Sequence, residues 1–304
     1  MYRSFQTIMS VLKPQVVFFL GDQFDEGNWC SEDEFLQYAD RLDSLFYVSN
    51  DVRRYFVAGN HDVGFHSSIF PHRLLQFSKR YERGLVDLVQ LENSYFVLLN
   101  SMAFQRDGCR LCQRAETELS LYRNLFDCVR NNSEECRKKY QNKIPTSRPI
   151  LVQHFPLFRE SDEFCPDDPS AAVGEDKTAK FRPDWDCLSI NSTHFLLEAL
   201  KPRAVFSGHV HYSCEKWWSG PYSFWEWTLP SFSWRNNKQP AVLLGVVSED
   251  DVVVSKCYLP NERTVWTLYG FSVLFLIFVF VISFVKRWNN HDPTYSRLLL
   301  VKSD

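Results

Sequence analysis

The stretch VVFFLGDQFD at residues 16–25 decides the fold, because an apolar run leads directly into a glycine and two carboxylates. A short apolar run bounded by a turn predicts a buried strand. Similar strand ends recur at AGNHD (residues 58–62), QH (residues 153–154) and GHVH (residues 208–211). Side chains that follow parallel strands meet at the carboxyl edge of a sheet. We therefore expect the four motifs to form one site.

One residue from each motif contributes to a predicted metal site, namely Asp22, Asn60, His154 and His209. Carboxylate and amide oxygens and imidazole nitrogens are common ligands of divalent metals. Asp22 can bridge to a second metal, and His211 is expected to reach that ion because alternate residues of extended backbone point opposite ways. Two metals about 3.5–4 Å apart can each bind a phosphoryl oxygen. The donor set thus predicts phosphoester hydrolysis.

Other residues of these motifs are predicted to assist the chemistry. His61 is expected to protonate the leaving alkoxide, with Asp62 orienting its ring and raising its basicity. Asp25 is expected to hold a ligand histidine or a water. Arg235 is a candidate phosphate contact, although an arginine near aromatic residues also fits a packing role. The histidines outside any motif are expected on the surface or in helices: His66, His72, His194 and His291.

The order of the predicted elements indicates an α/β fold. Strand and helix patterns alternate up to residue 206, and strands follow at residues 225–229, 242–247 and 252–258. This order predicts two packed β-sheets flanked by helices, the second more antiparallel. Residues 160–183 are rich in Asp, Pro and Ser and predict a long loop over the site. With 304 residues, 45% of them hydrophobic, the chain can bury one large core or two modest ones.

Residues 265–285 form an uncharged apolar segment. As a helix it would extend about 31 Å, enough to span the hydrocarbon core of a bilayer. Lys286 and Arg287 follow directly, which predicts a cytosolic tail and a luminal or extracellular main domain. The expected organisation is a metallophosphoesterase domain at residues 1–262, a transmembrane helix at 263–287 and a short tail at 288–304.

Nine cysteines and two glycosylation sequons, at Asn131 and Asn191, indicate an oxidising compartment. The pair Cys109-x-x-Cys112 with Cys128 and Cys136 fits either a zinc site or disulfides. The wide spacing of the second pair favours disulfides. The net charge of −3 lacks the excess of basic residues that is typical of nucleic-acid-binding proteins.

Taken in order, the motifs resemble the calcineurin-like metallophosphoesterase superfamily, whose fold is a four-layer αββα sandwich. Longer phrases are similar to members that act on glycosylphosphatidylinositol (GPI) anchors: LGDQFDEG at residues 20–27, VAGNHDVGFH at 57–66, PSFSWRN at 230–236 and SKCYLP at 255–260. The resemblance implies a luminal, membrane-bound enzyme that removes ethanolamine phosphate from the second mannose of the GPI glycan. Two divalent ions, with manganese as the expected metal, would serve as cofactors.

The same resemblance implies a place in the early secretory pathway, at endoplasmic reticulum exit sites, the intermediate compartment and the Golgi. The enzyme would promote transport of GPI-anchored proteins to the Golgi. Its expected partners are GPI-anchor glycolipids or GPI-anchored proteins, with cargo-receptor or coat contacts through the cytosolic tail.

The superfamily pattern begins with an Asp-x-His motif, and none precedes Asp22 in this sequence. The second metal site is therefore expected to be incomplete, with Asp22 and His211 as its remaining ligands. Residues 2–12 predict an amphipathic helix without the apolar core of a signal peptide. We interpret the chain as an N-terminally truncated form. Two alternatives stay open: a catalytically impaired membrane protein with a binding or regulatory role, and a hydrolase of another phosphoester.

Overall fold

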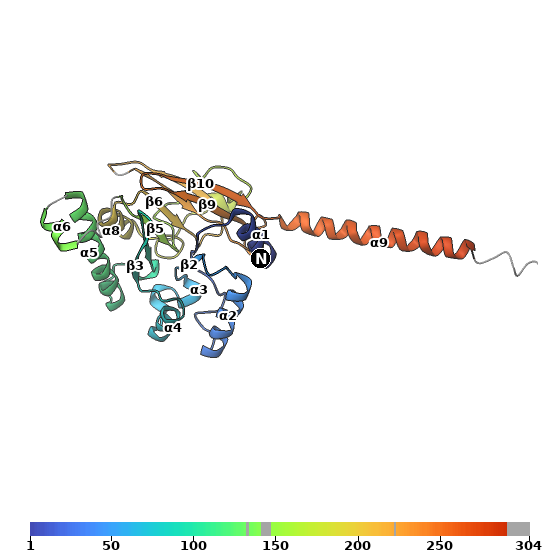
Figure 1. Ribbon diagram of the computed structural model, residues 1–304, viewed down its shortest axis with the longest axis horizontal. Coiled ribbons are helices and arrows are strands. Elements are labelled where there is room, and N and C mark those ends of the chain that lie inside the picture. The colour runs from blue at the N-terminus through green and yellow to red at the C-terminus, as the bar shows by residue number, and fades with distance from the viewer. Residues whose placement is uncertain (132–133, 141–146, 222, 291–304) are drawn as a thin grey trace, which may run out of the picture. The chain divides into compact units, whose positions relative to one another are not determined.

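The computed structural model describes residues 1–131, 134–140, 147–221 and 223–290 (Figure 1). Its contacts divide the chain into two units, Met1–Leu259 and Pro260–Asp304, which are treated separately below. The first unit contains all of the predicted site residues.

The first unit is organised around a six-stranded mixed sheet in the order β3-β4-β5-β6-β8-β7. Its four central strands run parallel, and an antiparallel pair lies at each edge. In the centre, Ile150 pairs with Ala204 and Val152 with Phe206, which aligns the ends of β5 and β6. The strands are β3 (Val86–Leu91), β4 (Ser94–Leu99), β5 (Ile150–Gln153), β6 (Ala204–Ser207), β7 (Cys214–Trp218) and β8 (Phe224–Thr228).

Two further strand pairs complete the β-structure of the described residues. β1 (Val16–Phe19) and β2 (Arg53–Phe56) are parallel, and β9 (Ala241–Val247) and β10 (Val252–Tyr258) are antiparallel. The strand expected at residues 225–229 does not join the second sheet. It is β8, which pairs in parallel with β6, and its other neighbour β7 was not predicted.

Two of the helices begin at clear sequence signals. Ser31 and Glu34 form a reciprocal capping box at the start of α2, and Pro71 occupies the first turn of α4. The α-helices of this unit are α1 (Tyr2–Leu12), α2 (Glu32–Leu45), α3 (Asn60–Val63), α4 (Pro71–Tyr81), α5 (Arg110–Asn131), α6 (Glu134–Tyr140), α7 (Glu175–Thr178) and α8 (Ile190–Leu200). Two short 3₁₀-helices are η1 (His66–Ser68) and η2 (Ser101–Ala103).

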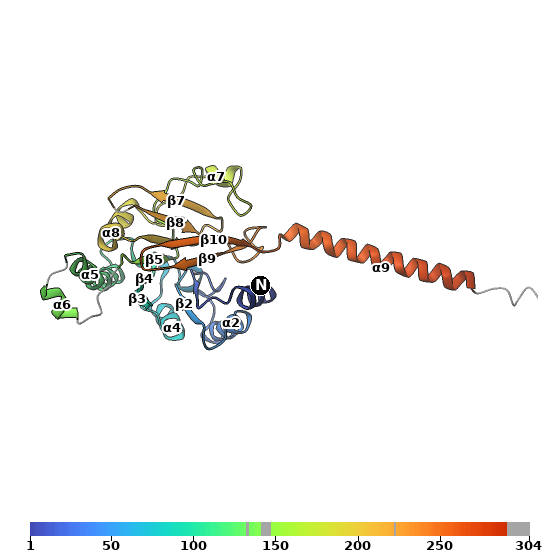
Figure 2. The same cartoon turned by 45° about the horizontal axis from the view of Figure 1, so that its top comes forward.

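Two hydrophobic clusters separate the layers. The larger joins the helices to one face of the strands and includes the fully buried Phe35, Val97 and Leu151. The smaller includes Ile150 and Trp227 and is covered by Leu243 and other residues of the β9–β10 pair. Figures 1 and 2 show helices on one side of the sheet and the β9–β10 pair on the other. Sheets flanked by helices confirm the predicted α/β class.

The structure resolves the cysteine alternatives in part. Disulfides join Cys128 to Cys136 and Cys165 to Cys214. The expectation of a disulfide is thus confirmed for Cys128 and Cys136. It is wrong for Cys109 and Cys112, which are free thiols.

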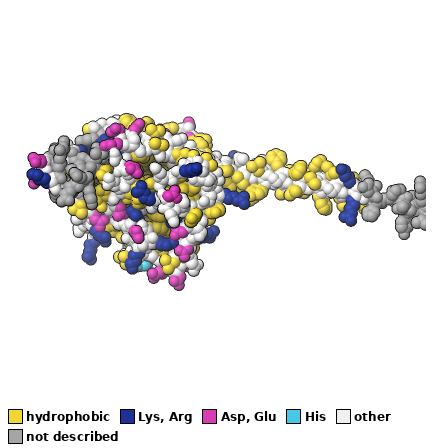
Figure 3. All heavy atoms as spheres, in the orientation of Figure 1, with side chains coloured by type: hydrophobic (Ala, Val, Ile, Leu, Met, Phe, Trp, Pro, Cys, Tyr) yellow, Lys and Arg dark blue, Asp and Glu magenta, His cyan; other side chains and the backbone are white. Residues whose placement is uncertain are grey.

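The second unit contains the helix α9 (Glu262–Asn290). Its segment Glu262–Trp288 is long and apolar enough to cross a membrane, and its side chains are exposed. Figure 3 shows hydrophobic side chains along this helix and basic ones at its end. The tail beyond residue 290 lies outside the described residues.

Candidate metal centre

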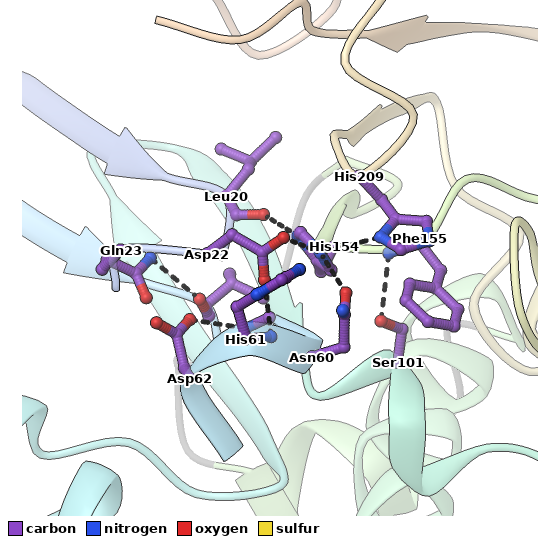
Figure 4. A network of polar contacts seen from close by, with 12 residues as sticks. Leu20, Asp22, Gln23, Asn60, His61, Asp62, Ser101, His154, Phe155 and His209 are labelled. Carbon is purple, nitrogen blue, oxygen red and sulfur yellow. Dashed lines mark hydrogen bonds and ion pairs between the residues drawn. The ribbon is translucent and has the colours of Figure 1, made fainter. Parts of the chain in front are cut away.

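The four predicted ligands follow the carboxyl ends of two pairs of parallel strands, β1–β2 and β5–β6. Asp22 follows β1, Asn60 opens α3 beyond β2, His154 follows β5, and His209 follows β6. Figure 4 shows their side chains converging around His154. The topology therefore brings together residues that lie as many as 187 positions apart in the sequence.

The Nε2 atom of His154 is the centre of this group. It lies 3.1 Å from Asn60 Oδ1, 3.2 Å from His209 Nδ1 and 3.3 Å from Asp22 Oδ2. The potential ligand atoms of Asp22, His154 and His209 all lie within 4.8 Å of one another. One small cation can therefore reach all of these atoms with modest adjustment.

Backbone carbonyls set which nitrogen of each imidazole faces the group. His154 Nδ1 lies 2.6 Å from the carbonyl oxygen of Leu20, and His209 Nε2 lies 2.8 Å from that of Trp185. In a neutral ring these nitrogens must donate, so the other nitrogen presents a lone pair to the centre. Lone pairs of two nitrogens and two oxygens then face one another. This donor set fits a divalent cation.

The electrostatics of the group favour positive charge at its centre. Burial would raise the pKa of Asp22, but the contact with His154 outweighs it and holds that pKa below its usual range. Burial opposes protonation of His154, yet Asp22 raises the pKa of this ring. Burial and the proximity of His154 lower the pKa of His209 to about 3. An ionised Asp22 and a neutral His209 are the states that metal ligation requires.

Two glycines allow the strand ends to approach this closely. A Cβ at Gly21, whose φ is 101°, would lie 2.2 Å from His154 Nδ1. A Cβ at Gly59 would lie 2.2 Å from the backbone nitrogen of Asp22. Asp22, His209 and His211 themselves have positive φ values of 52°, 72° and 66°. Such strained backbone in non-glycine residues is concentrated at functional sites.

His211 lies outside the tight group of Asp22, His154 and His209 within the described residues. It is near enough to Asp22 and His61 to interact with their charges, while burial lowers the pKa of its ring. The ligation of a second metal by His211 therefore stays a prediction.

His61 is oriented by Asp25 rather than by Asp62. Its Nδ1 lies 2.8 Å from the carbonyl oxygen of Asp25 and 4.0 Å from the Asp25 carboxylate. The Asp25 carboxylate also forms an ion pair with the exposed guanidinium of Arg235. Asp25 thus contacts His61 and Arg235 rather than a ligand histidine among the described residues, and its expected contact with a water stays a prediction. The guanidinium of Arg235 pairs with the carboxylate that lies 4.0 Å from the His61 ring.

Asp62 has a structural position that the sequence did not reveal. It is fully buried, and its two carboxylate oxygens accept hydrogen bonds from the backbone nitrogens of Phe24 (3.0 Å) and Gly59 (2.8 Å). These bonds tie the loop after β1 to the loop after β2. Burial, with the nearby charge of Asp22, raises the pKa of Asp62 to about 8. The expectation that Asp62 orients the His61 ring is corrected accordingly.

Aromatic residues around His209 were missed by the sequence analysis. The ring of Phe155 lies 4.2 Å from that of His209, and Phe65 stacks on Trp185 at 4.2 Å. Trp185 lies just beyond the loop expected to cover the site, and its carbonyl contacts His209. No local motif marks Trp185, and although Phe65 lies in the phrase VAGNHDVGFH, its stacking on Trp185 depends on tertiary contacts.

A family model described as calcineurin-like phosphoesterase matches residues 1–213. The chain belongs to this family. The metallophosphoesterase 1 homolog of Caenorhabditis elegans is 39% identical over 305 residues, covering 98% of this chain and 78% of that protein. Metallophosphoesterase 1 of Mus musculus is 38% identical over 286 residues, covering 93% of this chain and 71% of that protein. These matches confirm the predicted family and identify the chain as a metallophosphoesterase, a hydrolase that uses divalent metal.

Among solved structures, a dimetal phosphatase from Danio rerio aligns with 86% of this chain and 88% of its own. Its sequence identity is 16% and its TM-score is 0.48. The family assignment rests on the sequence matches.

The glycine at position 21 provides a test of the site. We expect Gly21→Ala to weaken Mn²⁺ affinity at least about 10-fold, because the new Cβ displaces His154. Gly174→Ala is the matched control, since Gly174 also has a positive φ of 59° but nothing within 4 Å of the added carbon. Calorimetric titration of both variants with Mn²⁺ measures the difference. Equal affinities would contradict the assignment of His154 as a ligand.

Proposed function

We propose that this chain is a phosphodiesterase that removes ethanolamine phosphate from the second mannose of the GPI glycan in the early secretory pathway. The observation that carries the enzymatic part is the convergence of Asp22, Asn60 and His209 on Nε2 of His154 in a chain of the phosphoesterase family. The GPI substrate is supported by the similarity of the four longer sequence phrases to GPI-remodelling members.

Asp22, Asn60, His154 and His209 would hold a cation that, when bound, polarises a phosphoryl oxygen as a Lewis acid. Their oxygen and nitrogen donors suit Mn²⁺. Asp22 and His211 are the residues that we propose would contribute to a second ion.

His61 is suited to the transfer of a proton to the leaving group. Because its Nδ1 donates to the carbonyl of Asp25, its Nε2 is the atom that carries the mobile proton. The ring is partly exposed, with 43% of the side chain accessible, so a substrate oxygen can approach it. Arg235 presents a planar guanidinium to the Asp25 carboxylate, which lies 4.0 Å from this ring, and this position supports a role as a phosphate contact.

A membrane-borne glycolipid substrate is supported by features of both units. The segment Glu262–Trp288 can anchor the chain in a bilayer. The ring of Trp185, a residue that is 47% exposed, stacks on Phe65, whose own ring lies 6.3 Å from that of His209. Elsewhere in the first unit, Trp217 and Trp225 are exposed and adjacent, whereas Trp227 is buried. Basic residues after the span support a luminal catalytic unit, with the tail available to cargo receptors or coat proteins.

Replacement of His61 tests the catalytic assignment. We expect His61→Ala to reduce kcat for a phosphodiester by about 10²–10⁴-fold, because the leaving alkoxide loses its proton donor. His72→Ala is the control, since His72 is an exposed histidine on α4. Steady-state assays of the Mn²⁺-loaded, detergent-solubilised chain compare the two. A His61→Ala enzyme as active as the His72→Ala control would exclude His61 as the acid.

The substrate is tested with a GPI glycolipid that carries ethanolamine phosphate on its second mannose, presented in the same detergent as a water-soluble phosphodiester. We expect release of ethanolamine phosphate with a kcat/KM well above that for the soluble compound, because remote contacts to the glycan contribute binding energy. Hydrolysis of the soluble compound alone would indicate another phosphoester substrate. Hydrolysis of neither would indicate a binding or regulatory role for residues 1–304.

A further inference from the structure

A second group of metal-binding side chains lies outside the site around His154. It consists of His66, Asp107, Cys109 and Cys112, whose potential ligand atoms all lie within 4.8 Å of one another. The group shares no residue with the phosphoesterase site. A third group, Asp162 with Cys165 and Cys214, has its two sulfurs joined in a disulfide and offers no thiolate.

We propose that His66, Asp107, Cys109 and Cys112 form a structural zinc site. Two thiolates, an imidazole and a carboxylate supply the four ligands of a closed tetrahedral zinc site, and thiolate ligands favour zinc over manganese. The Cys-x-x-Cys spacing is typical of such sites. The sequence did favour disulfides for these cysteines, but in the structure Cys128 bonds to Cys136 and leaves Cys109 and Cys112 together.

The distances within the group are close to those of a tetrahedral site. Nε2 of His66 lies 2.9 Å from Oδ2 of Asp107, and Sγ of Cys112 lies 3.3 Å from Oδ1 of the same carboxylate. Zinc bonds of about 2.0–2.3 Å place neighbouring tetrahedral ligands about 3.3–3.8 Å apart. Small side-chain shifts therefore suffice to bring all four atoms to a common ion.

The orientation of His66 supports ligation. Its side chain is only 7% exposed, and the residue lies in η1, so of the surface and helix positions expected from the sequence the surface one is wrong. Its Nδ1 lies 2.8 Å from the carbonyl oxygen of Met102, which leaves Nε2 facing the Asp107 carboxylate. A backbone carbonyl on the outer nitrogen is the usual support of a zinc-bound histidine. A metal-free ion pair between a protonated His66 and Asp107 would have the same contacts. The two cysteine sulfurs beside them favour the zinc site over such an ion pair.

The two cysteines are arranged around the start of α5. Cys112 is buried in the first turn of this helix, and its backbone nitrogen donates to Sγ of Cys109 at 3.2 Å. The backbone nitrogen of Cys109 donates to the Asp107 carboxylate at 3.0 Å. A backbone N–H that faces a cysteine sulfur, as at Cys109, favours a metal-bound thiolate at that position. The geometry therefore suits two metal-bound sulfurs.

The position of the group gives zinc a structural role. His66 opens η1, which follows the α3 segment that carries Asn60 and His61. Its partner Met102 belongs to η2, whose Ser101 hydroxyl accepts a hydrogen bond from the backbone nitrogen of Phe155, next to His154. An ion at this place would link two segments that support the phosphoesterase site.

Cysteine alkylation of the full-length chain tests the proposal without a mutation. Cys109 and Cys257 are both partly exposed free thiols, so Cys257 is an internal control. We expect removal of zinc with a chelator to accelerate alkylation of Cys109 at least about 10-fold while Cys257 is unchanged, because zinc masks the thiolate. The same result is expected in His209→Ala, since this variant alters only the other site. Equal rates at Cys109 before and after chelation, or a Cys109–Cys112 disulfide in non-reducing peptide mapping, would overturn the proposal.

Cobalt substitution gives an independent measurement. Cobalt(II) bound by thiolates produces a sulfur-to-metal charge-transfer band in the near ultraviolet, and the other site has no sulfur ligand. We expect this band in the Co²⁺-loaded chain and in Cys257→Ser, but not in the Cys109→Ser/Cys112→Ser variant. The double variant should also hold one zinc fewer per chain and unfold at a lower temperature than Cys257→Ser. A chain without the band, or a band that persists in the double variant, would contradict the proposal.

Discussion

The close approach of His154 to the ends of β1 and β2 is the constraint on which the rest of the site depends. A methyl group at Gly21 would overlap the His154 ring, and one at Gly59 would overlap the backbone of Asp22. Because glycine has no Cβ at either position, the two strand ends come near enough for three side-chain atoms to surround His154 Nε2. A bound cation relieves the repulsion among these lone pairs. The close packing of the two strand ends therefore favours a cation at this place.

The loops that carry the ligands are stabilised against this crowding by buried polar contacts. Asp62 joins the loops after β1 and β2 through backbone hydrogen bonds, and carbonyl oxygens orient the imidazoles of His154 and His209. The positive φ values of Asp22 and His209 show that their backbones are held away from the preferred regions. Core packing of the strands provides the rigidity, so the ligand positions are set before any ion binds.

Much of this arrangement was predictable from the sequence because strand ends and metal ligands leave local signals. An apolar run followed by Gly21 and Asp22, or by His154, marks both a strand and a ligand. The partner of His61 was not predictable, because Asp62 is adjacent in the sequence whereas Asp25 lies 36 positions away and reaches the ring only through the loop geometry. The place of β8 beside β6 also depends on tertiary topology. The burial of the His66 side chain against Asp107, 41 positions later in the chain, has the same cause.

The central claim is that Asp22, Asn60, His154 and His209 bind one cation between them. Anomalous diffraction at the manganese absorption edge, from crystals grown with Mn²⁺, tests it most directly. The account predicts a peak at bonding distance from all four side chains. A peak bound by other residues, or none at this place in crystals whose solution contains enough Mn²⁺ for activity, would contradict it.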